Sequence, residues 1–422
     1  MPTPPELLAP AGDIDKLKVA LDYGADAVYL GGDNFGLRAQ AGNFSLDNLH
    51  RAIEETHKRG KKLYLTLNAY LFEGQIAALE EYLEALRPLA LDAYIVSDPG
   101  VLSCIKNLDP TRKIHLSTQA NTLNAAACNF WQQHGVERVN LGRELPLQDI
   151  AAIRQGTQID LEVFVHGAMC VAYSGRCLLS TALTGRSANS GACAQPCRWN
   201  YTLVEESRPQ QAFGIEEDTH GTYIMNSRDL CLLEHIPDLI RAGISSLKIE
   251  GRMKTQYYVA TVTRVYRAAI DAYMADPSQY RCNPLWREEL DKISHRPYTT
   301  DFLPPHDATI HHQDSSYRRS HDFLGIVREQ RSATEFLVEG RNRFENGDSI
   351  EVIGPGMRQS EIVIQNARTS NDEPCPIIQP NALVWLVLPP DTCVGDMLRR
   401  EKPSAQHWSI TPAPRCKGTK DI

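Results

Sequence analysis

The sequence predicts an α/β protein, a (β/α)8 TIM-like barrel followed by a small C-terminal all-β domain. Short apolar, β-rich runs recur eight times before Pro277, and helical patterns lie between them. From Phe323 onward the hydrophobic period changes to two, with turn signals between the runs. Strands that alternate with helices and reach eight in number are typical of this barrel. A doubly wound sheet is the alternative, but it gives no reason for eight units.

Each predicted strand ends in a polar or glycine-containing turn. The strands are Glu6–Ala11, Ala27–Leu30, Lys62–Leu67, Ala93–Val96, Lys113–Ser117, Arg138–Leu141, Leu161–Val165 and Ser246–Ile249. Helical spacing of apolar residues predicts helices at Asp15–Tyr23, Leu46–His57, Gln75–Leu86, Asn124–His134 and Thr255–Tyr273. Asp13 and Asp98 stand where N-caps are expected, although Asp98 is also a candidate acid/base group.

The seventh unit is much longer than the others. It carries an insertion that contains four cysteines, and its last part, Asp229–Ile240, reads as the helix of this unit. Loops that follow the strands build the active face of such a barrel, so we expect the insertion on the catalytic rim. The expected domains are a barrel at 1–280 with the cysteine loop at 164–231, a connecting segment at 281–322, a β-barrel domain at 323–400 and a tail at 401–422.

The composition is that of an ordinary globular protein, with 422 residues, 42% hydrophobic and 23% charged. The chain contains no apolar run long enough for a membrane span, and its N-terminus does not resemble a secretory signal. We therefore expect a cytoplasmic protein, in which clustered cysteines bind metal or do redox chemistry. The net charge of −8 argues against bulk nucleic-acid binding, so an RNA partner would need a local basic patch.

Four of the 11 cysteines, Cys170, Cys177, Cys193 and Cys197, lie in this one loop. A structural zinc site prefers closely spaced pairs, and only Cys193 and Cys197 fit that spacing. An iron–sulfur cluster also takes four thiolates and tolerates wide spacing. Four unrelated thiols are the third interpretation. Cys231, just after the insertion, is an alternative fourth ligand.

Several segments carry a resemblance to a known family, among them ELLAPAG, YGADAVYLG, HLSTQAN, FVHGAMCVAYSGRCLLS, CAQPCRW and SLKIEGRMK. Together they resemble the collagenase-like peptidases, and within them the bacterial branch that hydroxylates tRNA with prephenate. The resemblance implies formation of 5-hydroxyuridine at the wobble position, without molecular oxygen. It also implies a [4Fe–4S] cluster held by Cys170, Cys177, Cys193 and Cys197, with Cys231 in reserve. Peptidase activity is not expected, because neither H-E-x-x-H nor G-x-S-x-G occurs.

The predicted catalytic residues stand at strand ends. Prephenate is a dianion, for which Arg143 and Arg252 are a natural clamp, unless they pair with Glu144 and Glu250 in a structural ring. His166 could transfer protons or donate to a cluster sulfur, or it could be a core histidine. The amide of Gln119, like those of Asn68 and Asn121, could bind a uracil edge or a carboxylate. The predicted substrate-binding residues are Asn68, Asn121, Glu250, Lys254, Tyr173, Arg198 and Trp199.

The expected RNA partner is the tRNA anticodon arm. Tyr173 and Trp199 are candidates for stacking on a flipped base. Candidate phosphate contacts are Arg176, Arg186, Arg198, Arg318 and Arg319. An electron donor is a further expected partner. The alternatives are an iron–sulfur hydroxylase of ribosomal RNA or of a quinone precursor, and a zinc-stapled RNA-binding scaffold.

Overall fold

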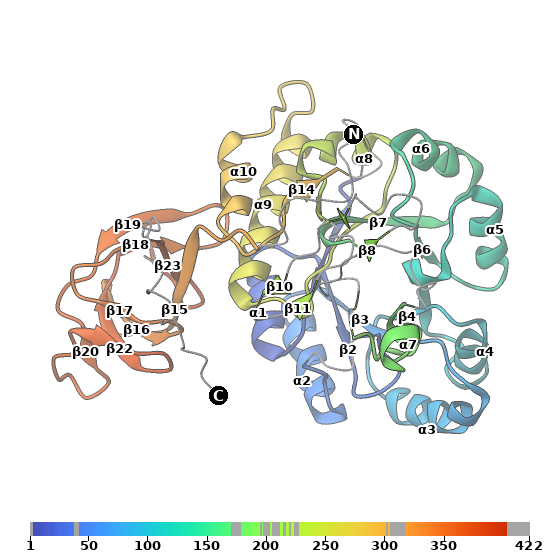
Figure 1. The fold of residues 1–422 in the computed structure, drawn as a ribbon, viewed down its shortest axis with the longest axis horizontal. Coiled ribbons are helices and arrows are strands. Elements are labelled where there is room, and N and C mark those ends of the chain that lie inside the picture. Colours follow the sequence, from blue (N-terminus) through green and yellow to red (C-terminus); the bar gives the residue numbers. More distant parts are fainter. Residues whose placement is uncertain are drawn as a thin grey trace, which may run out of the picture.

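The computed structural model describes residues 3–37, 42–169, 179–194, 196, 203–204, 212–213, 217–218, 221–222, 228–300, 303 and 317–402. Figure 1 shows two parts, a helix-surrounded barrel and a smaller β domain beside it. Among the described residues, no helix combines the length and the apolar character that crossing a membrane requires.

The barrel is a closed ring of parallel strands, as predicted. Its strands are β1 (Glu6–Pro10), β2 (Ala27–Gly31), β3 (Lys62–Leu67), β4 (Ala93–Val96), β5 (Lys113–Leu116), β6 (Arg138–Asn140), β7 (Asp160–Ala168) and β13 (Ser246–Ile249). Each strand pairs with the next, and β13 closes the ring by pairing with both β7 and β1.

The helices between the strands cover the outside of the ring (Figure 1). They are α1 (Ile14–Asp22), α2 (Leu46–His57), α3 (Ile76–Leu86), α4 (Pro99–Leu108), α5 (Ala125–Gln133), α6 (Leu147–Gly156), α8 (Ile236–Arg241) and α9 (Gln256–Ala275). Asp13 caps α1 by accepting from the backbone N–H of Lys16 at 2.8 Å, as predicted. The tyrosines of α9 are buried, so they serve packing.

The lumen changes character from one end of the barrel to the other. At the N-terminal end, Arg138 pairs with Glu6 at 2.5 Å, and Lys248 pairs with Glu162 at 3.0 Å. Beside these charges lies an apolar cluster made by Leu8, Ala27, Tyr29, Tyr64, Ala93 and Ile95. The charges are buried but paired, so this end of the lumen is a stability element and not a site.

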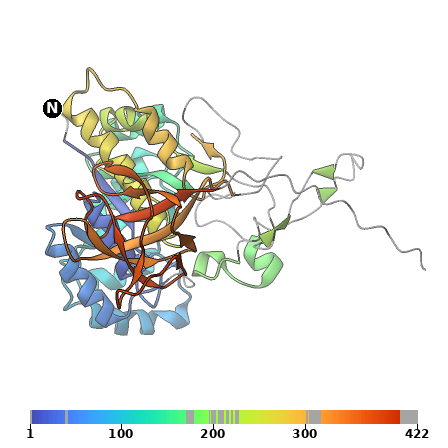
Figure 2. The same cartoon turned by 90° about the vertical axis from the view of Figure 1, so that its left-hand side faces the viewer.

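The insertion after β7 contains α7 (Leu179–Thr184), η3 (Ala188–Ser190), and the short strands β8 (Leu203–Val204), β9 (Ala212–Phe213), β10 (Glu217–Asp218) and β11 (Gly221–Thr222). Figure 2 shows these elements standing out from one end of the barrel. The chain returns through β12 (Asp229–Cys231), η5 (Leu233–His235) and then α8.

The prediction of one helix over Asp229–Ile240 was wrong in its first part. β12 pairs antiparallel with the end of β7 and parallel with β14 (Tyr298–Thr299). The Asp229 carboxylate accepts from the backbone and guanidinium of Arg296, which fixes this stretch as a strand. The partner that overrides the helical pattern lies more than sixty residues away in the chain.

The C-terminal domain is all-β, as predicted. Seven of its strands form one antiparallel sheet in the order β19-β18-β23-β15-β16-β22-β20. Their bounds are β15 (His321–Gln330), β16 (Glu335–Gly340), β18 (Ser349–Ile353), β19 (Gln359–Val363), β20 (Arg368–Thr369), β22 (Leu383–Val387) and β23 (Met397–Glu401), with β17 (Phe344–Glu345) and β21 (Ile377–Ile378) paired beside them.

A buried ionic cluster joins this domain to the barrel. Arg399 of β23 pairs with Glu289 of α10 (Pro284–Asp291), and Lys292 pairs with Glu351 at 3.1 Å. Arg264 of α9 donates to Glu289 and to the carbonyl of Gly354 at 3.2 Å. Each buried charge has a partner of opposite sign, so the two domains are held in one arrangement.

Candidate functional site

The C-terminal mouth of the barrel gathers the polar side chains that end its strands. Arg252, after β13, is 4% exposed and donates to Asn43 at 2.9 Å and to Thr66 at 3.4 Å. Its guanidinium lies against Gly31 at the end of β2, where a Cβ atom would be 2.1 Å from Nη2. Only glycine leaves room for the arginine at this point.

Arg143, the second predicted clamp residue, lies at the β6–β7 side of the mouth. Its Nη1 donates to the Ala168 carbonyl at 2.8 Å, and its guanidinium carbon lies 4.0 Å from the centre of the Phe164 ring. These contacts fix the plane of the guanidinium. The predicted alternative of pairing with Glu144 is not among the ion pairs found between described residues.

Three neutral side chains form a connected group at the ends of β3 and β5. Asn68 donates to Ser117 at 3.3 Å and to Gln119 at 3.4 Å, and its Oδ1 accepts from the Leu37 backbone at 3.3 Å. The bond from Leu37 sets which way the Asn68 amide faces. The amide of Gln119 then turns its oxygen toward Ser117 and its NH2 group away. The predicted pair Asn68 and Gln119 is thus brought together.

Two residues at the mouth were missed by the sequence predictions. Ser97 follows β4, Asn140 ends β6, and both are at most 2% exposed. The hydroxyl of Ser97 and both amide atoms of Asn140 have no hydrogen-bond partner in the described structure. An unmade bond on a buried polar group costs about 1–3 kcal/mol, so such groups call for an explanation. In the sequence, these two residues are marked only by their positions at strand ends. Serine and asparagine are common at such positions, so the positions did not distinguish them.

His166 points away from the lumen. A shift in register between Lys248 and Ile249 of β13 turns this part of β7, and His166 packs among Tyr258, Tyr266 and Tyr298 at 1% exposure. Burial lowers the pKa of His166 to about 3, so the ring is neutral. This environment is that of the core histidine given above as the alternative.

Of the candidate cysteines, Cys193 and Cys231 lie in the described residues. The segment of Cys193 is seated on the mouth, since Tyr70 N–H donates to the Asn189 carbonyl at 3.0 Å and Ala194 N–H to Ser180 Oγ at 3.0 Å. Gly191 approaches so closely that a Cβ would lie 2.6 Å from the Gly36 carbonyl oxygen. Cys193 is half-buried there.

Cys231 has a different environment. It ends β12 opposite His166 in the antiparallel pair, at 3% exposure. The Tyr266 hydroxyl lies 3.8 Å from its sulfur and the Arg287 guanidinium 3.7 Å. Burial raises the pKa of the Cys231 thiol, so in these surroundings it is protonated.

Of the four predicted cluster ligands, the described residues include Cys193 alone, and no group of three His, Cys, Asp or Glu side chains that could hold a metal is found among them. Neither Cys193 nor Cys231 takes part in a disulfide. Cys193 is half-buried on a segment whose backbone is fixed against the mouth. Cys170, Cys177 and Cys197 lie outside the described residues, as do Tyr173, Arg176, Arg198 and Trp199.

The remaining predicted residues lie at or near the mouth. Asp98 caps α4, with Oδ1 accepting from the Gly100 N–H at 2.7 Å and Oδ2 from the Leu71 N–H at 2.9 Å, which favours the cap over an acid/base role.

Asn121 has left-handed backbone at φ 56°, and its Oδ1 has no partner among the described residues. Lys254 packs between the rings of Tyr258 and Tyr317. Glu250 accepts from Tyr29 at 3.2 Å.

The predicted phosphate contacts differ in their surroundings. Arg186 is exposed on the segment that carries Cys193. Arg318 and Arg319 are exposed near the domain junction, and Arg319 pairs with Asp322 at 2.6 Å.

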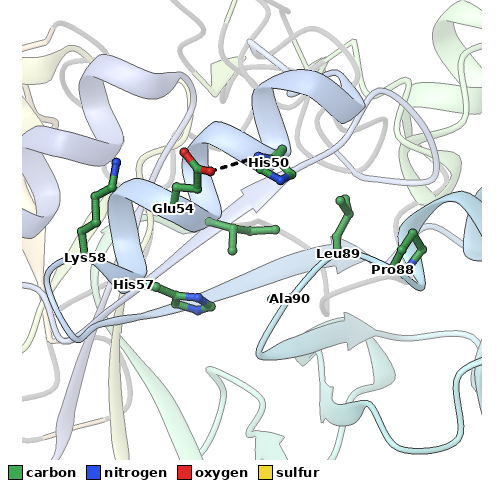
Figure 3. Close-up of a pocket in the computed structure, with 8 residues that line it drawn as sticks. His50, Glu54, His57, Lys58, Pro88, Leu89 and Ala90 are labelled. Atoms are coloured by element: carbon green, nitrogen blue, oxygen red, sulfur yellow. Dashed lines mark ion pairs between the residues drawn. The ribbon is translucent and has the colours of Figure 1, made fainter.

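A hollow of about 460 Å³ lies on the outer wall, between α2 and the α3–β4 connection. Figure 3 shows His50 and His57 of α2 on one side of this hollow and Pro88 and Leu89 on the other. Lys58 and Ala90 precede strands β3 and β4, so the hollow is near the stabilising end of the barrel. We therefore do not assign the chemistry to it.

The comparisons with known proteins agree across both domains. Residues 12–313 match the model of "Peptidase family U32", and residues 319–399 match that of its C-terminal domain. The chain is 41% identical over 355 residues to the "tRNA hydroxylation protein P1" of Bacillus subtilis, covering 83% of this chain and 84% of that protein. It is 36% identical over 431 residues to the "tRNA hydroxylation protein P" of Escherichia coli, covering 92% and 94%.

A third relative acts on a different RNA. It is the "23S rRNA 5-hydroxycytidine C2501 synthase" of Escherichia coli, 36% identical over 313 residues that cover 74% of this chain and 45% of the relative. With both family models matched and these relatives spanning most of the chain, the protein belongs to peptidase family U32, in a group that includes tRNA hydroxylation proteins.

Proposed function

We propose that this protein is an RNA-modifying hydroxylase that acts on tRNA in the cytoplasm. The observation that carries the proposal is the similarity to two tRNA hydroxylation proteins through more than four fifths of the chain. The finer proposal is 5-hydroxylation of the wobble uridine, dependent on prephenate and independent of molecular oxygen.

The mouth of the barrel supports this chemistry with three kinds of group. Arg143 and Arg252 are oriented guanidinium groups suited to a dicarboxylate such as prephenate. Asn68 and Gln119 offer neutral hydrogen bonds nearby. Phosphates of the anticodon arm would meet exposed arginines such as Arg186.

A [4Fe–4S] cluster would be held by Cys170, Cys177 and Cys193, with Cys197 or Cys231 as the fourth ligand. When bound, it would supply one-electron transfer. Replacing C5–H of uracil by C5–OH with oxygen at the level of water releases two electrons and two protons, so the reaction needs a two-electron acceptor, and an electron-transfer protein is the expected partner.

Peptidase activity, which the family name suggests, is not supported by the described residues. Cys231 and His166 do lie side by side and both contact the Tyr266 hydroxyl. The His166 ring is packed among Tyr258, Tyr266 and Tyr298, and burial keeps the Cys231 thiol protonated. A nucleophilic cysteine needs the opposite environment.

The test of the cofactor is an anaerobic visible spectrum with iron and sulfide counts. Wild type should be brown, and cysteine-to-serine variants at the four ligand positions should lose the absorbance near about 400 nm. Comparison of Cys197→Ser with Cys231→Ser identifies the fourth ligand. A colourless protein containing zinc would favour the RNA-binding scaffold instead.

The test of the substrate is a nucleoside analysis of a deletion strain. Loss of a single hydroxylated nucleoside from tRNA supports the proposal. Intact tRNA together with loss from ribosomal RNA, or of a quinone, would support the alternatives.

A further inference from the structure

One sector of the lumen, at the mouth ends of β4, β5 and β6, carries neutral polar groups. Side chains alternate between the two faces of a strand. Ser97 therefore shares the lumen face of Ala93 and Ile95, and Asn140 shares that of Arg138, whose guanidinium reaches Glu6 across the lumen. Ser117 stands between them on β5 and is bonded to Asn68.

Asn140 and Ser97 have no hydrogen-bond partner in the described structure, and the same holds for Nδ1 of His115 below them. The Oδ1 and Nδ2 atoms of Asn140 and the Oγ atom of Ser97 are buried without a partner. Buried polar side chains are almost always hydrogen-bonded, so an unpartnered one calls for an explanation such as a bound water, an ion or a role in catalysis. Here one amide offers a donor and an acceptor side by side.

Below Ser97 and Ser117 the lumen is lined by Ile95, Tyr64 and His115, whereas the charged Arg138 and Glu162 are the strand neighbours of Asn140. The Tyr64 and His115 rings meet edge to face at 4.6 Å between centroids, and Ile95 packs with Tyr64. Burial, together with the charges of Arg138 and Lys248, lowers the pKa of His115 well below its ordinary value, so this ring is neutral. Apolar and aromatic side chains of this kind can pack against a planar base, while Arg143 and Arg252, the candidates for the dianion, stand at other strands.

We propose that the β4–β6 sector of the lumen receives the pyrimidine base to be hydroxylated, with the Asn140 amide and the Ser97 hydroxyl binding its polar edge. The inference rests on the proposed function and adds to it the place where the base binds. Uracil presents N3–H beside two carbonyl oxygens, which matches the acceptor and donor of one amide. A base can enter only when it is flipped out of its stack, as anticodon-loop bases allow.

The test measures binding of two RNAs to the full-length protein, prepared anaerobically. One is an anticodon stem–loop with uridine at the wobble position, and the other is the same RNA with an abasic nucleotide there. Wild type should bind the uridine RNA about tenfold more tightly, the size of one good base contact. Asn140→Leu, of similar shape, should abolish this preference and leave the abasic RNA bound as before, since its phosphate contacts remain. Ser97→Ala should reduce the preference.

Thermal unfolding separates a ligand-binding role from a structural one. Asn140→Leu removes an unpartnered buried amide, so its melting temperature should equal or exceed that of wild type. Thr263→Val is the matched control, because Thr263 Oγ1 is also buried without a described partner, but on α9. This control should keep the wild-type preference for uridine.

Each outcome has a definite meaning. If Asn140→Leu melts lower and still prefers the uridine RNA, the amide is structural and the inference is overturned. If wild type binds neither RNA, the proposed function fails and takes this inference with it. If wild type prefers the uridine RNA and both lumen variants do so equally, the proposed function stands and only the base site is wrong.

Discussion

At the scale of single residues, close packing and hydrogen bonds fix the positions of the polar side chains at the mouth of the barrel. Arg252 occupies its position because Gly31 has no side chain and because Asn43 and Thr66 accept from its guanidinium. The sequence identified Arg252 as a strand-end arginine. It could not predict that the guanidinium packs against Gly31, because this contact joins the ends of β2 and β13, which lie far apart in the sequence.

Gly31→Ala should displace Arg252 and weaken prephenate binding. The added Cβ would lie 2.1 Å from Nη2, so the guanidinium must move. The loss of one charge-assisted hydrogen bond predicts a rise in the KM for prephenate of about tenfold or more. Gly74→Ala is the control, because a Cβ there meets nothing within 4 Å. An unchanged KM in Gly31→Ala would show that Arg252 does not bind the co-substrate.

Local signals predicted other residues well. Asp13 and Asp98 cap helices, since a cap needs only backbone N–H groups two or three residues ahead. Asn140 and Ser97 were missed for the reverse reason. Their place in the proposal comes from the absence of hydrogen-bond partners among the described residues, which no sequence pattern encodes.

At the scale of elements, the return strand β12 shows where pattern reading fails. The run from Asp229 to Ile240 has apolar spacing that suits a helix, yet its first three residues join the barrel sheet beside β7. The Asp229–Arg296 pair holds it there at 3.1 Å, with both side chains at most 2% exposed. Periodicity predicted the eight parallel strands. It could not predict β12, because that strand is held in the sheet by Arg296, which is distant in the sequence.

Asp229→Asn should strongly destabilise the barrel. It leaves the charge of Arg296 buried without a counter-charge, which predicts a loss of about 3 kcal/mol in the free energy of unfolding. Denaturant titration followed by circular dichroism measures this loss. Asp372→Asn, which breaks the exposed pair with Arg331, should show no measurable change. Equal effects of the two variants would mean that the buried pair does not hold β12.

At the scale of the whole molecule, the two domains share one buried cluster of charges. Arg399, Arg264 and Lys292 surround Glu289 and Glu351 at the junction. A period of two predicted the β domain, but nothing in the sequence located its contact with α9 and α10. The cluster joins residues more than one hundred positions apart.

The junction should respond to acid. Burial alone would raise the pKa of Glu289, but the hydrogen bond from Arg399 and the charges of Arg264 and Lys292 lower it to about 2. A lowered pKa gives stability that is present above the ordinary value of about 4.5 and is lost as the pH falls from there toward 2. The stability that depends on this group is about 3 kcal/mol.

Unfolding measured between pH 6 and about pH 2 tests this dependence. Glu289→Gln should be less stable at neutral pH and should lose part of the acid dependence, whereas the exposed Glu361→Gln should follow wild type. An acid profile of Glu289→Gln parallel to that of wild type would show that other carboxylates control the junction.

The most direct measurement is the reaction itself. Anaerobic incubation of purified protein with unmodified tRNA, prephenate and a redox partner should yield a uridine heavier by one oxygen atom, detected by mass spectrometry of the nucleosides. The product should be absent without prephenate and absent with Cys193→Ser, while the exposed Cys393→Ala should retain it. A hydroxylated uridine that forms equally well with Cys193→Ser would contradict the assignment of the cysteine loop as the redox centre. No product from intact, cluster-containing protein would contradict tRNA hydroxylation.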